Sequence, residues 1–170
     1  MGAWGKGTFD NDIALDWAGC LNDREDLTLI RENIAQVLSI GSGYLELELA
    51  CEALAACEVV AWLRGNWGKR DGYTEGVEAW VRQHPIAPPA ELVRQAVQAL
   101  DRIASPPSEL LEEAEGDVDW DRKLIGRRLA IGHRPMNGCL GRRDAGQRRR
   151  GDAGWCRIEH RESLHGHSAA

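Results

Sequence analysis

The most apolar stretch of the chain runs from Leu45 to Leu63, and it constrains the fold more than any other feature. Small and apolar side chains would occupy most of the circumference of a helix over residues 44–64. Such a helix is typically the central, most buried one of a domain. Four carboxylates interrupt the stretch, at Glu46, Glu48, Glu52 and Glu58. A membrane-spanning helix would not carry four such charges, so we expect a globular domain and no membrane span.

Apolar residues recur at helical spacing in further segments, which glycine and proline residues separate. No segment shows sustained strand alternation bounded by hairpin turns. The sequence therefore predicts an all-α fold, a compact multi-helix array of the bundle-like kind. The expected helices lie at 12–21, between the polar turn 22–26 and Gly41, at 44–64, after Thr74, from Pro89 to Ile103, after Ser108, and at 118–130.

Residues that favour helix N-termini stand before several of these segments. Asp10 or Asn11 offers an N-cap for the first helix. Thr74 and Ser108 offer N-caps for the fourth and sixth helices. Pro89 suits the first turn of the fifth helix, because proline needs no backbone donor there.

The charge of the chain changes sign along its length. Up to Trp120 the chain carries 22 acidic and 9 basic residues, a net charge of −13. From Asp121 onward it carries 5 acidic and 12 basic residues, a net charge of +7. Phosphates are bound by Lys and Arg, so the acidic part argues against a nucleic-acid-binding surface there.

Helical periodicity ends after Ala130, so the sequence predicts a helical domain over residues 1–130 and a basic tail over residues 131–170. Apolar residues of the tail are too few and too scattered to cover a core face, which predicts disorder. Two interpretations remain open, a disordered native tail and a segment translated out of frame. The triplet Arg148–Arg150 could bind nucleic acid without specificity, and no specific nucleic-acid partner is predicted.

Five cysteines, an odd number without regular spacing, argue against the disulfide framework of a secreted protein. The first residues contain neither the basic nor the apolar region of a signal peptide, so we expect a cytoplasmic protein. Cysteine and histidine residues of the tail lack the spacing of a zinc site. No metal or other cofactor is predicted. His84 is the single histidine before the tail, which offers little support for a nucleophile and base pair.

The densest pattern of the chain is its N-terminal run, Gly-Ala-Trp-Gly-Lys-Gly-Thr-Phe-Asp-Asn-Asp over residues 2–12. It resembles the opening of a bacterial family, the domain of unknown function numbered 4259, whose members begin Gly-x-Trp-Gly-x-Gly-x-Phe and continue with Asp or Glu, Asn and Asp. The matching residues are Gly2, Trp4, Gly5, Gly7, Phe9, Asp10, Asn11, Asp12, Ala14 and Asp16. The resemblance continues more loosely through the third helix, Trp80 and residues 108–110, and it fades near Trp120. It implies a fold and no known activity.

The N-terminal run has an architectural and a functional interpretation, and both use the same candidate residues. In the first, Trp4 and Phe9 bracket a Gly-rich strap that plugs one end of the bundle, while Asp10 or Asn11 caps the first helix. Asp12 then interacts favourably with the helix N-terminus. In the second, oxygen ligands for Mg²⁺ or Ca²⁺ come from Asn11, Asp12 and Asp16, the last two of which share a helix face. The candidate binding residues are Trp4, Phe9, Asp10, Asn11, Asp12 and Asp16.

The absence of a catalytic constellation, together with the acidic helical part, favours a non-enzymatic binding module. A concrete form is an inhibitor or immunity-type protein that covers a basic protein partner. The acidic run of residues 109–119 is either a solvated face or a phosphate mimic that occupies such a partner. The alternatives are a small divalent-metal-dependent enzyme that uses Asp10, Asp12 and Asp16, and a purely structural protein.

Overall fold

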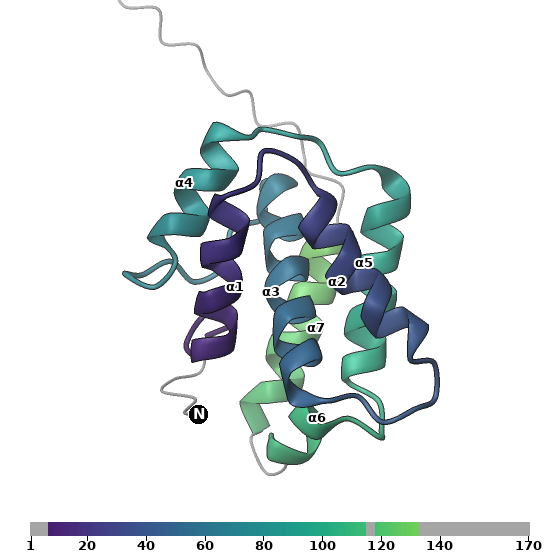
Figure 1. The fold of residues 1–170 in the computed structure, drawn as a ribbon. Coiled ribbons are helices and arrows are strands. Elements are labelled where there is room, and N and C mark those ends of the chain that lie inside the picture. Colours follow the sequence, from purple (N-terminus) through teal and green to yellow (C-terminus); the bar gives the residue numbers. More distant parts are fainter. Residues whose placement is uncertain (1–6, 115–117, 133–170) are drawn as a thin grey trace, which may run out of the picture. The chain divides into compact units, whose positions relative to one another are not determined.

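The computed structural model describes residues 7–114 and 118–132, and over these residues the fold is all-α (Figure 1). Seven helices make up this part of the chain, and no strand occurs in it. The fold class predicted from apolar periodicity is therefore confirmed. The helices are α1 (Asp12–Asn22), α2 (Thr28–Ser39), α3 (Leu47–Leu63), α4 (Glu75–Gln83), α5 (Ala90–Ile103), α6 (Glu109–Glu113) and α7 (Val118–Gly132).

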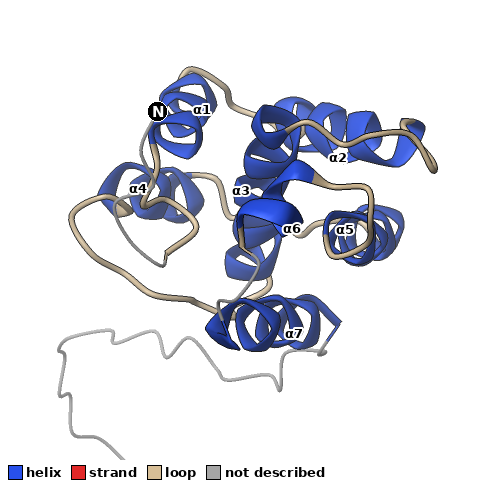
Figure 2. Cartoon of the chain, turned by 90° about the horizontal axis from the view of Figure 1, so that it is seen from below, coloured by secondary structure: helices blue, strands red, loops and turns tan. Residues whose placement is uncertain are grey.

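Helix α3 is the centre of the domain. It packs against each of the other six helices, and Figure 2 shows it between α1 and α4 on one side and α2 and α5 on the other. Twelve of its 17 residues are buried, among them Val59, Val60 and Trp62. Small side chains let several helices approach this one closely, which explains why its apolar residues surround it instead of forming a stripe. The prediction of a central third helix is confirmed.

Helices α1, α2, α4 and α5 each bury one face. In α5, for example, Leu92, Ala96, Leu100 and Ile103 are buried, at the three- and four-residue spacing that places side chains on one face of a helix. This face packs against α2, α3 and α7. Removing a buried leucine side chain such as that of Leu100 typically costs about 2–5 kcal/mol of stability, so this face holds α5 on the core.

Asn11 caps α1. Its Oδ1 accepts a hydrogen bond of 2.8 Å from the backbone N–H of Ala14, which resolves the choice between Asp10 and Asn11. Thr74 and Ser108 occupy the N-cap positions of α4 and α6 as predicted, but neither side chain bonds to its helix backbone. The Thr74 hydroxyl instead bonds to the backbone of Asp71.

The α6 N-terminus is satisfied by backbone pairing. The N–H of Glu109 donates to the carbonyl of Leu45 (2.9 Å), and the N–H of Leu45 donates to the carbonyl of Pro107 (3.2 Å). These bonds form an isolated parallel bridge between Leu45 and Ser108. The first N–H of α6 thus has a partner already, and the Ser108 hydroxyl is fully buried without one among the described residues.

Arg102, near the end of α5, joins the α2–α3 loop to the α5–α6 loop. Its guanidinium donates to the carbonyls of Gly41 (2.7 Å), Gly43 (2.5 Å), Ser105 (2.9 Å) and Pro107 (3.0 Å). One cation therefore bonds to both the α2–α3 loop and the α5–α6 loop. Charge-assisted bonds of this kind are stronger than neutral ones, so the two loops are held together.

Two sequence predictions fall outside the described residues. Trp4 belongs to residues 1–6, and the predicted disordered tail belongs almost entirely to residues 133–170. Helix α7 extends to Gly132, two residues past the predicted domain boundary at Ala130. No helix among the described residues has the length and apolar character needed to cross a membrane.

Candidate functional site

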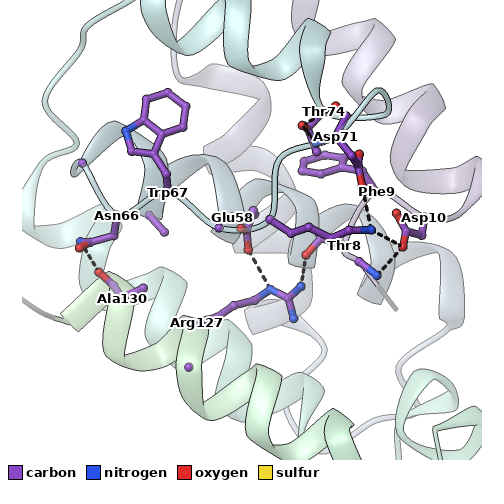
Figure 3. A pocket seen from close by; sticks show the side chains of 16 residues that line it. Thr8, Phe9, Asp10, Glu58, Asn66, Trp67, Asp71, Thr74, Arg127 and Ala130 are labelled. Atoms are coloured by element: carbon purple, nitrogen blue, oxygen red, sulfur yellow. Dashed lines mark hydrogen bonds and ion pairs between the residues drawn. The ribbon is translucent and has the colours of Figure 1, made fainter. Parts of the chain in front are cut away.

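A pocket of about 740 Å³ lies where the N-terminal motif meets the C-terminal half of α3 (Figure 3). Its walls come from the strap before α1, from α3, from the α3–α4 loop and from α7. Its volume falls within the range of about 300–1,000 Å³ typical of small-molecule sites. The lining residues are Gly7, Thr8, Phe9, Asp10, Glu58, Ala61, Gly65, Asn66, Trp67, Gly68, Lys69, Asp71, Thr74, Gly126, Arg127 and Ala130.

A buried ion pair stands in this pocket. Arg127 Nε of α7 donates to Glu58 Oε2 of α3 at 2.8 Å, and both side chains are largely buried. Trp62 Nε1 donates to the other oxygen, Glu58 Oε1, at 2.9 Å. Arg127 Nη2 also donates to the Thr8 hydroxyl. Both carboxylate oxygens of Glu58 are therefore occupied, as a buried charge requires.

The sequence did not predict this pair. Glu58 was interpreted as one of four charges that argue against a membrane span, and Arg127 was counted as part of the basic half of the chain. The available signal was the position of Glu58 within the most buried helix. A carboxylate there must find a cation, because an unpaired buried charge costs several kcal/mol. Which of the cations pairs with it depends on how α7 packs.

Asp10 is the motif residue with the most constrained environment. It is buried, and its Oδ2 accepts bonds from the backbone N–H of Gly7 (2.7 Å) and from Lys69 Nζ (3.3 Å). Gly7 approaches so closely that a Cβ there would lie 2.8 Å from Asp10 Oδ1. The glycine of the motif thus permits the tight turn that brings its N–H to Asp10.

Lys69 connects Asp10 with a second carboxylate. Its Nζ lies 2.7 Å from Asp71 Oδ2, while its side chain remains 63% exposed. The hydrogen bonds to Asp71 and Asp10 raise the pKa of Lys69. The bond from Lys69 lowers the pKa of Asp71, and the backbone N–H groups of Tyr73 and Thr74 lower it further. Lys69 and Asp71 are therefore both charged at neutral pH.

Aromatic rings extend from the core to the pocket rim. Phe9 is 2% exposed and lies 6.1 Å from Trp62, and Trp62 lies 5.2 Å from Trp67, measured between ring centroids. Trp67 is 39% exposed. The guanidinium carbons of Arg70 and Arg82 each lie 5.8 Å from its ring centroid. Such cation–π contacts hold an exposed indole in place.

The structure separates the residues predicted as a site. Phe9 and Asp10 line the pocket, whereas Asn11 caps α1. Asp12 and Asp16 belong to α1, do not line the pocket, and are half-buried and exposed, respectively. Within residues 7–114 and 118–132, no three His, Cys, Asp or Glu side chains gather as metal ligands would. The described residues therefore provide no set of ligands for the metal site considered from the sequence.

A second surface, at the opposite end of α3, is acidic. We call it the acidic face: Tyr44, Glu46, Glu48, Glu52, Glu109, Glu112 and Glu113. Tyr44 is 47% exposed, and its hydroxyl donates to Glu112 Oε2 at 3.3 Å. None of the Lys and Arg side chains that the structure describes forms an ion pair with these carboxylates.

Several carboxylates of this face act on two common neighbours, Tyr44 and Cys51. Desolvation raises the pKa of the Tyr44 phenol, and Glu112, Glu109 and Glu46 raise it further. Burial raises the pKa of the Cys51 thiol to about 11, with contributions from Glu113, Glu52 and Glu109. Carboxylates of α3 and α6 therefore form one negative region.

Comparisons with known proteins give one match. Residues 2–123 match the family described as Domain of unknown function (DUF4259). Comparisons with curated proteins and with solved structures found no match. The matched range includes the N-terminal strap, helices α1 to α6 and the start of α7, which is well over half of the 170 residues. The predicted family resemblance is thereby confirmed, and the chain belongs to the DUF4259 family.

Proposed function

We propose that the protein is a non-enzymatic binding module, of the inhibitor or immunity type, that covers a basic protein partner with its acidic face. The observation that carries the proposal is the composition of this face. Six carboxylates come from two segments, three of them (Glu46, Glu109 and Glu112) act on the exposed Tyr44, and no described cation pairs with any of the six. Tyrosine is enriched at protein interfaces because it combines an apolar ring with a polar end.

The backbone beneath the acidic face is braced. Glu109 Oε2 accepts a bond of 2.8 Å from the N–H of Leu47, the first residue of α3. The Leu45–Ser108 bridge and the four bonds of Arg102 hold the neighbouring loops. A surface that is ordered before binding loses less conformational entropy in a complex, which favours affinity.

Charge supports recognition at long range as well. The first 120 residues carry a net charge of −13, so a basic partner would be attracted before contact. Such steering raises association rates and weakens as salt screens it. Binding through this face should therefore be salt-sensitive.

The composition of the pocket supports binding more than catalysis. Its described lining contains no His, Cys or Ser side chain, and its carboxylates Asp10, Glu58 and Asp71 are each paired with a cation. We place the protein in the cytoplasm, and the free thiols of Cys20, Cys51 and Cys57 support a reducing compartment.

The test is a pull-down from a lysate of the native host at low ionic strength, using the full chain as bait. We expect a basic protein to be captured and to be released as salt increases. A variant with Glu46→Gln, Glu112→Gln and Glu113→Gln should lose it. The matched control, Glu25→Gln, Glu32→Gln and Glu75→Gln, removes the same charge from other exposed positions and should retain it.

Two results would contradict the proposal. One is capture of no stable partner at low salt. The other is a partner whose capture is reduced equally by both triple variants, because that result would indicate attraction to net charge and not recognition by the acidic face.

A further inference from the structure

The pocket beneath the N-terminal strap presents hydrogen-bonding groups that have no partner among the residues that the structure describes. Arg127 is held by Nε and Nη2, which donate to Glu58 and Thr8. Its Nη1 has no hydrogen-bond partner among the described residues, and Arg127 lines the pocket. A guanidinium whose orientation is set by a carboxylate, with donors open to a pocket, is well suited to bind a carboxylate of a ligand.

The opposite charge is presented nearby. Asp10 is buried, its bonds from Gly7 and Lys69 both fall on Oδ2, and its Oδ1 has no hydrogen-bond partner within the described part of the chain. Asp71 faces the same Lys69 ammonium. Thr8, which contacts Arg127, is two residues from Asp10, so their Cα atoms are at most about 7 Å apart. Arg127 and Asp10 therefore meet the same strap and line the same pocket, one with a positive and the other with a negative group.

Lys69 occupies the negative end of the pocket. Its ammonium lies 3.3 Å from Asp10 and 2.7 Å from Asp71, yet its side chain is 63% exposed. Exposed ion pairs are weak because water and salt screen them. The side chain can therefore swing into solvent, and an incoming ammonium group can take its place between the same two carboxylates.

The remaining wall is apolar. The Trp67 ring is partly exposed at the rim, and the alanines Ala61 and Ala130 line the pocket. Gly65 and Gly68 add no side chain that would fill the space. In Figure 3 the Trp67 ring and the charged groups lie on different sides of the pocket, so a ligand could place an apolar body on the ring while its charged groups reach Arg127 and Asp10.

We propose that this pocket binds a small zwitterion of the amino acid type, with its carboxylate on Arg127, its ammonium group between Asp10 and Asp71 in place of Lys69, and an apolar side chain against Trp67. The inference concerns a different site from the acidic face, so either proposal can fail without the other.

The test is isothermal titration calorimetry of the full chain with three probes. L-phenylalanine has both charged groups and an apolar ring, 2-phenylethylamine lacks the carboxylate, and 3-phenylpropanoate lacks the ammonium group. We expect L-phenylalanine to bind and each analogue to bind at least roughly tenfold more weakly. No heat with L-phenylalanine at about 10 mM, where a millimolar site would be nearly filled, would overturn the proposal, and so would equal affinity for all three probes.

Two variants test the assigned contacts. Arg127→Lys keeps the positive charge beside Glu58 but removes the second amino group, and should weaken L-phenylalanine binding roughly tenfold. Its control is Arg128→Lys on the same helix, where the side chain is 57% exposed and pairs with Asp101. The control should bind as the unmodified chain does. Equal binding by Arg127→Lys and its control would contradict the carboxylate contact.

Lys69→Met tests the exchange of ammonium groups. With the internal cation removed, the ligand's ammonium group no longer competes for Asp10 and Asp71, so L-phenylalanine should bind more tightly. The control is Arg94→Met, which removes an equally exposed cation that pairs with Glu91 on α5, and it should leave binding unchanged. Weaker or unchanged binding by Lys69→Met would show that Lys69 does not occupy the ammonium position.

Discussion

Glu58 of α3 and Arg127 of α7 form a buried ion pair, with 2.8 Å between Oε2 and Nε. It links the central helix to the last described one. The partners are 69 residues apart in the sequence, and each also bonds to a third group, Trp62 or Thr8. The N-terminal strap, the core and α7 therefore depend on one another at this point.

Removing one member of this pair should be costly. Arg127→Met leaves the Glu58 carboxylate buried without its cation, and we expect the free energy of unfolding to fall by about 3 kcal/mol in urea denaturation. Glu58→Gln combined with Arg127→Met should lose less than the two single variants together, because neither charge is then left alone. The control Arg128→Met breaks an exposed pair with Asp101 and should cost less than about 1 kcal/mol. Equal losses in the two methionine variants would contradict this account.

Gly68 should not tolerate a side chain. A Cβ at this position would lie 2.0 Å from Glu58 Oε1, and that carboxylate cannot easily move because Trp62 and Arg127 both hold it. We expect Gly68→Ala to lower the free energy of unfolding by about 1–3 kcal/mol, the usual cost of overpacking. Gly72→Ala in the same loop is the control, because a Cβ there meets no atom within 4 Å. Thermal denaturation of both variants would check this, and similar melting temperatures would disprove it.

A chain of hydrogen bonds from α1 to α3 should make the free energy of unfolding depend on pH. Trp17 Nε1 donates to Asn33 Oδ1 (2.8 Å), and Asn33 Nδ2 donates to Glu52 Oε2 (2.7 Å). Burial, and then the charge of Glu48, raise the pKa of Glu52 above its ordinary value of 4.5. The folded chain therefore binds the proton more tightly than the unfolded chain, and this contribution to stability is lost as pH rises through the raised value.

The variant Glu52→Gln keeps an oxygen that can accept from Asn33 and removes the charge. We expect its stability relative to the unmodified chain to increase as pH rises from about 4 to 7, when measured by urea denaturation at several pH values. The variant Glu32→Gln, which removes an exposed carboxylate of α2, should show little such trend. If the difference in unfolding free energy between Glu52→Gln and the unmodified chain stays the same at every pH, the raised pKa of Glu52 is contradicted.

The thiols of the described residues should differ in reactivity. Cys20 is exposed, whereas Cys51 is 6% exposed and Cys57 is fully buried. In a full chain with Cys139→Ser and Cys156→Ser, a disulfide reagent at about pH 8 should modify Cys20 rapidly and the other two only after unfolding, since reaction requires an accessible thiolate. Mass spectrometry of labelled peptides would locate the modified thiols. Rapid labelling of Cys57 in the folded chain would be incompatible with this core.

Alkaline pH should destabilise the fold through Cys51. Its pKa is raised from 9.0 to about 11 by burial and by Glu113, Glu52 and Glu109. Between these values the folded chain retains a proton that the unfolded chain has released, so stability falls by about 1.4 kcal/mol per pH unit from this group. Cys51→Ala should show a shallower decline in unfolding free energy than the unmodified chain between about pH 9 and 11. An equal decline in both proteins would argue against a role of Cys51.

Periodicity and breakers in the sequence predicted the helices well. The first helix was expected at 12–21 and lies at Asp12–Asn22, and the third was expected at 44–64 and lies at Leu47–Leu63. These predictions succeed because helix position depends mainly on local spacing of apolar side chains and on residues that favour helix ends. Thr74 and Ser108 stand at the predicted N-cap positions without side-chain caps: the Thr74 hydroxyl bonds to the Asp71 backbone, and the N–H of Glu109 bonds to the Leu45 carbonyl.

The sequence by itself determined that the fold is all-α, that α3 is central, that Asn11 is one of two possible caps for α1, and that the chain belongs to the DUF4259 family. Only the tertiary structure decided which distant side chains meet. The Glu58–Arg127 pair, the Asp10–Lys69–Asp71 contacts and the acidic face each join segments that lie far apart in the chain. The physical reason is that local spacing fixes which face of a helix is apolar, whereas the pairing of charges depends on how the helices pack around α3, and one sequence allows several charged partners until that packing is known.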